Sequence, residues 1–187
     1  MLFTDGDCIA RADFLQTHID FKEKGYFLSG GYFKLPMVIS KEITKLDIEL
    51  QNCFNIHWLK RQGLKSSFKN NKITASGNFA KFLNKFTPTK ATWNGHNSSG
   101  WKEDILAVNG FDERMQYGGE DRELGERMFN NSIKSKQLRY SAICIHLDHT
   151  RSYVKSEMIE KNKAIRDKTK TKKIIKTPFG IEKLHQQ

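Results

Sequence analysis

Hydrophobic and polar positions alternate along the chain with periods typical of strands in some segments and of helices in others. Short apolar runs predict strands over residues 1–4, 26–36 and 138–147. Apolar residues at helical spacing predict helices over residues 12–24, 40–61, 103–108, 120–131 and 152–170. Strands that alternate with helices indicate an α/β fold, in which ligands bind beyond the carboxyl ends of the strands.

The helix predicted over residues 40–61 has the longest amphipathic pattern, and it is expected to stop at Gly63. Its apolar face contains Ile43, Leu46, Leu50, Phe54 and Trp58. Residues 65–88 are polar, basic and weakly patterned, which predicts a variable excursion. Residues 93–100 are rich in Gly, Asn and Ser and should form irregular backbone, and a tail is expected after residue 170.

The composition is that of one globular domain rather than of a disordered chain. With 187 residues, 37% of them hydrophobic, the chain is long enough to bury one core. No apolar run approaches the length of a membrane span, and no signal-peptide pattern opens the sequence. Cys8, Cys53 and Cys144 are widely spaced, which favours a reducing compartment over a disulfide framework. A cytoplasmic location is therefore expected.

Positive charge is concentrated at the carboxyl end of the sequence. The net charge is +11, and residues 151–187 hold eleven Lys or Arg against four Asp or Glu. Such an excess attracts polyanions, namely nucleic acids, anionic lipid headgroups or a phosphate-bearing substrate. For most of the individual lysines, a solvated helix with a basic tail is the simpler explanation.

Two acidic clusters stand out in this basic chain. Asp5-Gly6-Asp7 follows the first predicted strand, and Gly118-Gly119-Glu120-Asp121 opens a predicted helix. In an extended segment Asp5 and Asp7 point to the same side, where their oxygens suit a hard cation such as Mn²⁺ or Mg²⁺. A carboxylate at a helix start can accept a proton. Taken alone, the first cluster is more typical of a turn or helix cap, and Glu120-Asp121 of a capping pair.

A third candidate group closes the last predicted strand. His146-Leu147-Asp148-His149 offers two imidazoles, which suit a transition metal better than Mg²⁺ and so favour Mn²⁺. In isolation, a His at a strand end is more often a surface residue or a satisfied core residue.

Read together with two further motifs, these segments form an ordered series at regular intervals. The further motifs are Trp93-Asn94-Gly95-His96-Asn97 and Asn109-Gly110-Phe111-Asp112-Glu113. Over residues 93–153 and the start of the chain, the series resembles the GT-A glycosyltransferases, most closely family 2 enzymes and the C-terminal domain of the galactosyltransferase type. The resemblance implies a GT-A-like mixed sheet flanked by helices, a nucleotide-sugar donor, a divalent metal (Mn²⁺ or Mg²⁺), and a glycan or lipid-linked acceptor.

The resemblance also implies roles for single residues. Asp5 and Asp7 match the metal-binding DxD pair. His149 matches a later metal ligand, and His146 a position that is a ligand only in some members. Asp121 matches the catalytic base, and Glu120 a neighbour that helps to place the acceptor. Because no separate nucleophile is evident, an inverting single displacement is expected.

Substrate contacts are expected around the same motifs. Gly118 and Gly119 would allow a tight backbone turn against the substrate, although a simple helix-entry loop explains them too. Gly95 and Asn97, from the same motif, are expected to contact the substrates, and Asn97 is expected to hydrogen-bond donor or acceptor. Tyr117 is the aromatic residue best placed to stack on a sugar ring, whereas Trp93 and Trp101 are more typical of a core.

The chain differs from full-length relatives at its beginning. Those enzymes start with two or three βα units that bind the nucleotide, and no such units precede Met1. The sequence is therefore expected to be an incomplete, C-terminal part of the fold. Residues 1–150 would supply the metal and acceptor side, and residues 151–187 a basic helix and tail. Such a chain is expected to be weakly active or inactive alone.

Two other functions stay open. The chain could be a non-catalytic remnant or partner subunit of a membrane-associated transferase, peripheral to the anionic inner face of the membrane through its basic tail. It could also be a basic nucleic-acid-binding module. A nucleic acid is not the expected partner, because no helix-turn-helix, zinc or RNP-like pattern is visible and the acidic clusters would repel phosphates.

Overall fold

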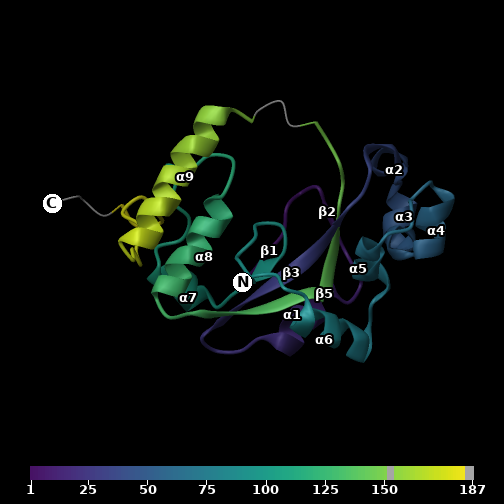
Figure 1. Cartoon of the computed structure of the whole chain (residues 1–187), viewed down its shortest axis with the longest axis horizontal. Coiled ribbons are helices and arrows are strands. Elements are labelled where there is room, and N and C mark those ends of the chain that lie inside the picture. The colour runs from purple at the N-terminus through teal and green to yellow at the C-terminus, as the bar shows by residue number, and fades with distance from the viewer. Residues whose placement is uncertain (151–153, 184–187) are drawn as a thin grey trace.

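A five-stranded mixed sheet runs through the middle of the computed structural model, which describes residues 1–150 and 154–183 (Figure 1). The strands lie in the order β1-β4-β3-β5-β2. Their bounds are β1 Leu2–Phe3, β2 Cys8–Ala10, β3 Tyr26–Lys34, β4 Ser98–Ser99 and β5 Lys134–His146. The central strands β3 and β5 are parallel, and the other pairs are antiparallel. The predicted α/β class is confirmed.

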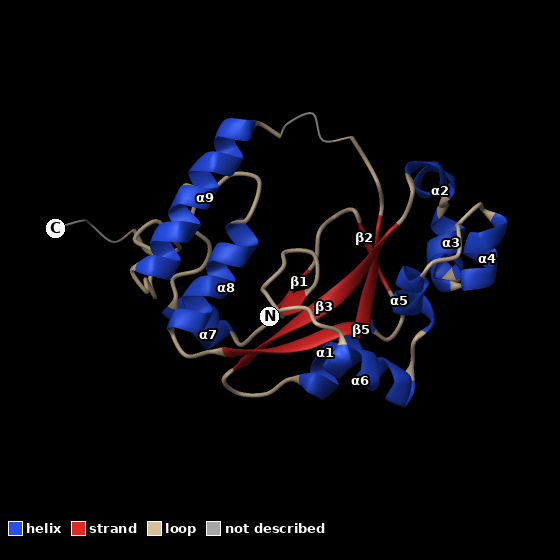
Figure 2. Ribbon diagram, in the orientation of Figure 1, coloured by secondary structure: helices blue, strands red, loops and turns tan. Residues whose placement is uncertain are grey.

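Helices surround this sheet on several sides (Figure 2). The α-helices are α1 Phe14–Phe21, α2 Met37–Glu42, α3 Lys45–Glu49, α4 Ile56–Arg61, α5 Asn71–Thr74, α6 Gly77–Phe86, α7 Lys102–Ala107, α8 Glu120–Asn130 and α9 Ser156–Thr171. Two short 3₁₀ turns are η1 Asn52–Phe54 and η2 Phe68–Asn70. Helices α7 to α9 gather at one end of the molecule and α2 to α5 at the other, with α1 and α6 below the sheet in this view. None of the helices in the described ranges is long and apolar enough to cross a membrane.

The single helix predicted over residues 40–61 is wrong, because the chain breaks there into α2, α3, η1 and α4. Thr44 begins α3 with a capping box, in which its hydroxyl and the Asp47 carboxylate bond each other's backbone N–H groups. Gln51 then adopts a left-handed backbone with φ 57°, and Asn55 caps α4 through its side-chain oxygen. These local hydrogen bonds outweigh the apolar periodicity.

Two other predictions need correction. The segment 65–88 is not an unstructured excursion, since it contains α5 and α6. The sequence did not predict strand β2, which pairs with β5 so that Cys8 lies opposite His146. The bend expected at Gly30-Gly31 is an irregularity of register within an unbroken β3. Gly30 is needed there, since a Cβ would lie 2.0 Å from the Asn97 side-chain oxygen.

An aromatic core lies between the sheet and helices α7 and α8. Trp93 is fully buried, and its ring centroid lies 5.4 Å from those of both Phe3 and Phe27. Leu124 and Met128, one turn apart on α8, close this core from the other side. Trp93 therefore packs in the core, where it has no surface to offer a sugar ring.

A buried ion pair fixes α8 to its neighbours. The carboxylate of Glu123 and the guanidinium of Arg127 lie one helical turn apart, 2.8 Å from each other, and both are essentially inaccessible to solvent. Arg127 also donates to the carbonyls of Val108 and Gly110. Thr169 of α9 donates its hydroxyl to Glu123 at 2.8 Å. One pair of charges thus joins α8, α9 and the loop after α7.

The segment after α9 is not a free tail, because residues of the Asn109–Glu113 motif bind it. The Asn109 amide donates to the carbonyls of Thr177 and Glu182 at 2.7 and 2.8 Å. The buried Asp112 carboxylate accepts from the Thr177 hydroxyl at 2.6 Å. This motif therefore holds the C-terminal segment onto the α7 end of the molecule.

Removing one partner of the buried ion pair should be costly. Arg127→Met leaves the Glu123 carboxylate buried without its counter-charge, so the free energy of unfolding should fall by about 3–5 kcal/mol in urea denaturation. The double variant Glu123→Leu with Arg127→Met buries no charge and should recover most of that loss. A double variant that is no more stable than the single one would contradict this role of the pair.

Candidate functional site

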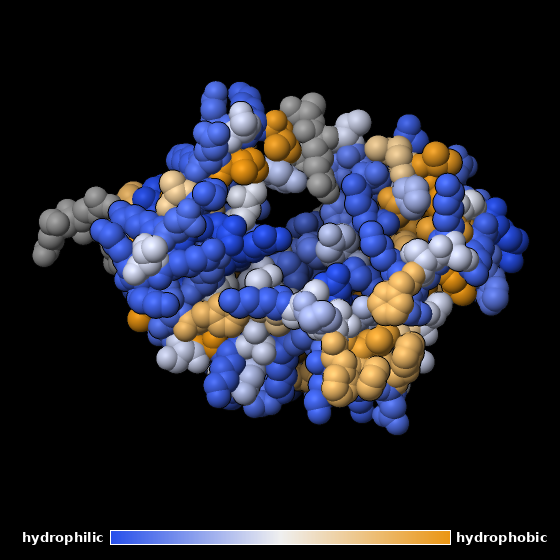
Figure 3. All heavy atoms as spheres, viewed as in Figure 1, coloured by the Kyte–Doolittle hydropathy of each residue, from blue (hydrophilic) through white to orange (hydrophobic). Residues whose placement is uncertain are grey.

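A cavity of about 530 Å³ opens between the sheet and helices α8 and α9. Figure 3 shows it as a hollow in the middle of the displayed face, with hydrophilic residues around it. It brings both acidic clusters and the histidine motif into one space. Of the predicted site residues, those that line it are Asp5, Asp7, Gly95, Tyr117, Gly118, Gly119, Glu120, Asp121, His146 and His149.

Asp7 and two histidines form the first group of ligand atoms in this cavity. The Oδ2 atom of Asp7 lies 2.9 Å from Nε2 of His149 and 3.6 Å from Nε2 of His146. The two imidazole rings are nearly parallel, with an interplanar angle of 8°. The other oxygen of Asp7, Oδ1, is buried and has no hydrogen-bond partner within the described residues. A buried oxygen of this kind is suited to a cation.

Cys8 lies beside this group, since its sulfur, Asp7 and His146 place ligand atoms within 4.8 Å of one another. The hydrogen bond with Cys144, together with burial, raises the pKa of the Cys8 thiol well above its usual range. A protonated thiol is a weaker metal ligand than a thiolate. Oxygen and imidazole nitrogen remain as donors, and this set suits Mn²⁺ better than a thiophilic metal.

Asp121 and Glu120 begin α8 and form the second group. Asp121 accepts hydrogen bonds from the backbone N–H of Gly95 at 3.2 Å and of Arg122 at 2.6 Å. Glu120 accepts one from the N–H of Gly118 at 2.7 Å. Burial raises the pKa of Glu120, and the neighbouring charge of Asp121 adds to this effect.

Gly95 lies where the two groups meet. A Cβ on this residue would be 3.7 Å from Oδ1 of Asp5 and 3.9 Å from Cβ of Asp121. The carboxylate at the end of β1 and the one at the start of α8 therefore face the same short stretch of backbone. This juxtaposition joins positions more than a hundred residues apart in the sequence.

The turn before α8 depends on glycine and on α9. Gly118 and Gly119 have φ angles of 105° and 91°, which other residues rarely adopt. A Cβ on Gly118 would lie 2.3 Å from the Ile159 side chain of α9. The buried Asn162 of α9 donates to the carbonyls of Tyr117 and Gly118, both at 3.1 Å. Helix α9 therefore forms a wall of the cavity and is not a freely solvated basic helix.

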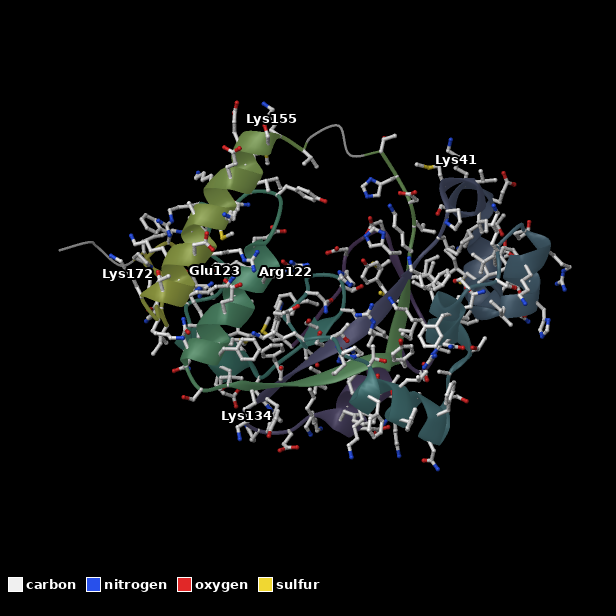
Figure 4. All side chains as sticks on the ribbon, viewed as in Figure 1. Lys41, Arg122, Glu123, Lys134, Lys155 and Lys172 are labelled. Carbon is white, nitrogen blue, oxygen red and sulfur yellow. The ribbon has the colours of Figure 1, made fainter. Side chains whose placement is uncertain are left out.

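Charged residues of α8 and α9 extend the cavity wall. Arg122, Lys163 and Arg166 line it, and Arg166 is held by Glu126 at 2.6 Å. Figure 4 shows Arg122 on the side of α8 that faces the middle of the molecule, and Glu123 between α8 and α9. Among the lining residues of the cavity, the cations Lys34, Arg122, Lys163 and Arg166 are matched in number by the carboxylates of Asp5, Asp7, Glu120 and Asp121.

The predicted substrate contact of Asn97 needs correction. Its side chain is fully buried and does not line the cavity. The amide nitrogen donates to the carbonyls of Gly31 and Ala142 at 2.7 and 3.0 Å, and the amide oxygen lies 2.9 Å from Nε2 of His18. Asn97 thus joins β3, β5 and α1 beneath the cavity, a role that its place in an irregular loop does not reveal.

His96, next to Asn97, was not predicted and does line the cavity. Its ring lies against Tyr32, with centroids 4.5 Å apart. Burial lowers the pKa of His96 to about 4, with the nearby positive charges of His146 and Lys72 contributing. A neutral imidazole can donate or accept a hydrogen bond at the base of the cavity. Only its position inside a recognised motif could have pointed to it.

Comparison with known protein families gives a match over part of the chain. Residues 78–150 match the model of a family described as the N-terminal domain of galactosyltransferase. No curated protein matches the whole chain or part of it significantly. The matched segment includes Gly95, the start of α8 and His149, and it is similar to a galactosyltransferase-type glycosyltransferase domain over fewer than half of the 187 residues.

The buried His18 beneath the site should make the fold sensitive to acid. Burial lowers the pKa of His18, although its hydrogen bond with Asn97 opposes this. The unfolded chain therefore takes up a proton that the folded chain resists, and the free energy of unfolding should fall as the pH drops from about 7 to about 5. His18→Gln should show a weaker pH dependence, measured by urea denaturation at each pH. His57→Gln, at an exposed position, should behave like the unmodified chain; equal slopes in all three would contradict the expectation.

Proposed function

From the similarity of residues 78–150 to the galactosyltransferase family model, we propose that the chain transfers a sugar from a nucleotide-sugar donor to a hydroxyl group of a glycan or lipid-linked acceptor. The observation that carries the proposal is the convergence of Asp7, His149 and Asp121 on one cavity. A candidate metal group and a candidate proton acceptor then face the same bound substrates.

The metal group fits a divalent cation. Asp7 and His149 would hold it, with Asp5 at the same cavity and His146 as a further ligand. The buried Oδ1 of Asp7, which has no hydrogen-bond partner among the described residues, and the mixture of oxygen and imidazole donors favour Mn²⁺. When bound, such a cation neutralises charge on the diphosphate leaving group of the donor. Positive side chains of the cavity wall, such as Arg122 and Lys163, would support the same diphosphate.

Asp121 is the proposed general base. The N–H groups of Gly95 and Arg122 fix its carboxylate at the cavity wall, where it can accept the proton of the attacking acceptor hydroxyl. Glu120, whose pKa burial raises, would bind an acceptor hydroxyl and help to orient it. With Asp121 as a base rather than a nucleophile, the transfer is a single displacement that inverts the anomeric carbon.

The direct test is transfer by the purified chain. A panel of nucleotide sugars with Mn²⁺ and glycan acceptors should yield a product whose formation stops when the metal is chelated. Complete absence of transfer and of donor hydrolysis across the panel would contradict the proposed activity of this chain.

Loss of the proposed general base should greatly lower the rate of the chemical step. Asp121→Asn keeps the size of the side chain but removes its basicity, so kcat should fall by about 10²–10⁴-fold with little change in the KM of the donor. Asp20→Asn, at an exposed position on α1, should leave the rate unchanged. If Asp121→Asn transfers sugar as fast as the unmodified chain, Asp121 is not the base and a non-catalytic role for the chain gains support.

The metal site can be tested without any substrate. Titration with Mn²⁺, followed by calorimetry, should detect binding by the full chain that Asp7→Asn or His149→Ala weakens by about tenfold or more. His57→Ala, which removes an exposed imidazole of α4, should bind as the unmodified chain does. Equal Mn²⁺ affinity in all four proteins would show that this group does not hold the metal.

A further inference from the structure

Two additional cavities continue from the candidate site along the sheet. The first, of about 420 Å³, shares Tyr32, His96, Asp121 and Arg122 with the candidate site. The second, of about 650 Å³, lies beyond it and shares Tyr32, Lys72 and Arg139 with the first. A ligand whose reacting group lies at Asp121 can therefore reach Lys72 and Arg139 through these adjoining cavities.

These cavities are strongly positive. The residues that line the larger one include Lys34, Lys65, Lys69, Lys72 and Arg139, and no Asp or Glu is among its lining residues within the described part of the chain. In the smaller cavity, Asp121 is the only acidic residue among the described lining residues. Lys34 pairs with Asp148 at 2.9 Å, whereas no ion pair of Lys72 or Arg139 is found among the described residues.

Two of these cations, Lys72 and Arg139, are half-buried. The Lys72 ammonium donates to the carbonyl of Tyr32 at 2.8 Å and lies 4.9 Å from the centre of that ring. Burial, together with the charges of Arg139 and Lys69, lowers the pKa of Lys72 to about 8. Nε of Arg139 is buried and has no hydrogen-bond partner within the described residues. A buried donor without a partner is costly unless a ligand supplies one.

We propose that Lys72 and Arg139 bind a negatively charged group, a carboxylate or a phosphate, on the acceptor that receives the sugar. This inference rests on the proposed function and specifies its substrate class as an anionic glycan. The acceptor is favoured over the donor because this path begins at Asp121, which faces the attacking hydroxyl, whereas the diphosphate of the donor belongs at the Asp7 group. Arginine and lysine together suit an oxyanion, which charge-assisted hydrogen bonds hold.

Binding without donor or metal tests the site independently of transfer. The probes are three disaccharides that differ in one group, which is a hydroxyl, a carboxylate or a phosphate monoester. The full chain should bind a charged probe about tenfold or more tightly than the neutral one, and added salt should reduce this difference. The comparison of carboxylate with phosphate identifies which oxyanion the site prefers.

Substitutions of Lys72 and Arg139, each with a matched control, test where the charged probe binds. Lys72→Gln and Arg139→Gln should each weaken binding of the preferred charged probe by about tenfold and leave the neutral probe unaffected. Lys60→Gln and Arg61→Gln remove the same charges from exposed positions on α4 and should change nothing. Melting temperatures of all four variants check that each is folded, and relief of repulsion between cations should keep Lys72→Gln at least as stable as the unmodified chain.

The outcomes separate this proposal from the proposed function. Equal affinity for neutral and charged probes, or no effect of Lys72→Gln and Arg139→Gln, would overturn the anion site. Weaker binding of uridine diphosphate, rather than of the disaccharides, in these variants would assign the cations to the donor and overturn the proposal as well. If the charged probe binds through both residues while no sugar transfer is found, the anion site stands and the proposed function fails.

Discussion

The buried pair of Glu123 and Arg127 is the interaction on which the site most depends. Neither charge reaches solvent, so each must be satisfied from within, and the neighbouring groups that do this come from two other segments. The carbonyls of Val108 and Gly110 accept from Arg127, and the Thr169 hydroxyl donates to Glu123. Because a buried charge without partners costs several kcal/mol, α8 is confined to one position relative to α9 and to the loop after α7. Asp121, two residues before Glu123, takes its place at the cavity from this constraint.

The basic C-terminal part of the chain has a structural role that its charge alone does not suggest. Helix α9 carries many exposed lysines, yet its buried Asn162 and its Ile159 close over the Gly118-Gly119 turn. The segment that follows is bound by Asn109 and Asp112. A motif that resembles an acceptor-side signature thus stabilises the wall of the cavity rather than lining it.

The charged residues divide the site into one region that favours a cation and another that favours an anion. On one side, Asp7 favours a cation, because one of its buried oxygens has no hydrogen-bond partner in the described part of the chain. On the other, Lys72 and Arg139 favour an anion, and Asp121 lies where the two regions meet. Charge that is left uncompensated inside a folded chain costs stability, and bound ligands can offset that cost. Both the proposed metal and the proposed anionic acceptor follow from this physical reason.

The sequence by itself determined the features that depend on neighbouring residues. The periodicity of Leu124 and Met128 predicted α8, the apolar run from Tyr26 predicted β3, and the family resemblance of the motifs around Asp5, Asp121 and His149 indicated which side chains to propose for the site. The helix expected over residues 40–61 failed because the caps at Thr44 and Asn55 offer backbone hydrogen bonds that an apolar pattern does not reveal.

Only the tertiary structure decided what depends on contacts between distant segments. It placed Asn97 in the interior, because the carbonyls of Gly31 and Ala142 come within reach of its amide only when β3 and β5 pair. It brought His96 and Lys72 to the cavities, and it set the C-terminal segment against Asn109. Local pattern records the preferences of a few neighbouring residues, whereas burial and charge balance are settled by which distant residues the fold brings together.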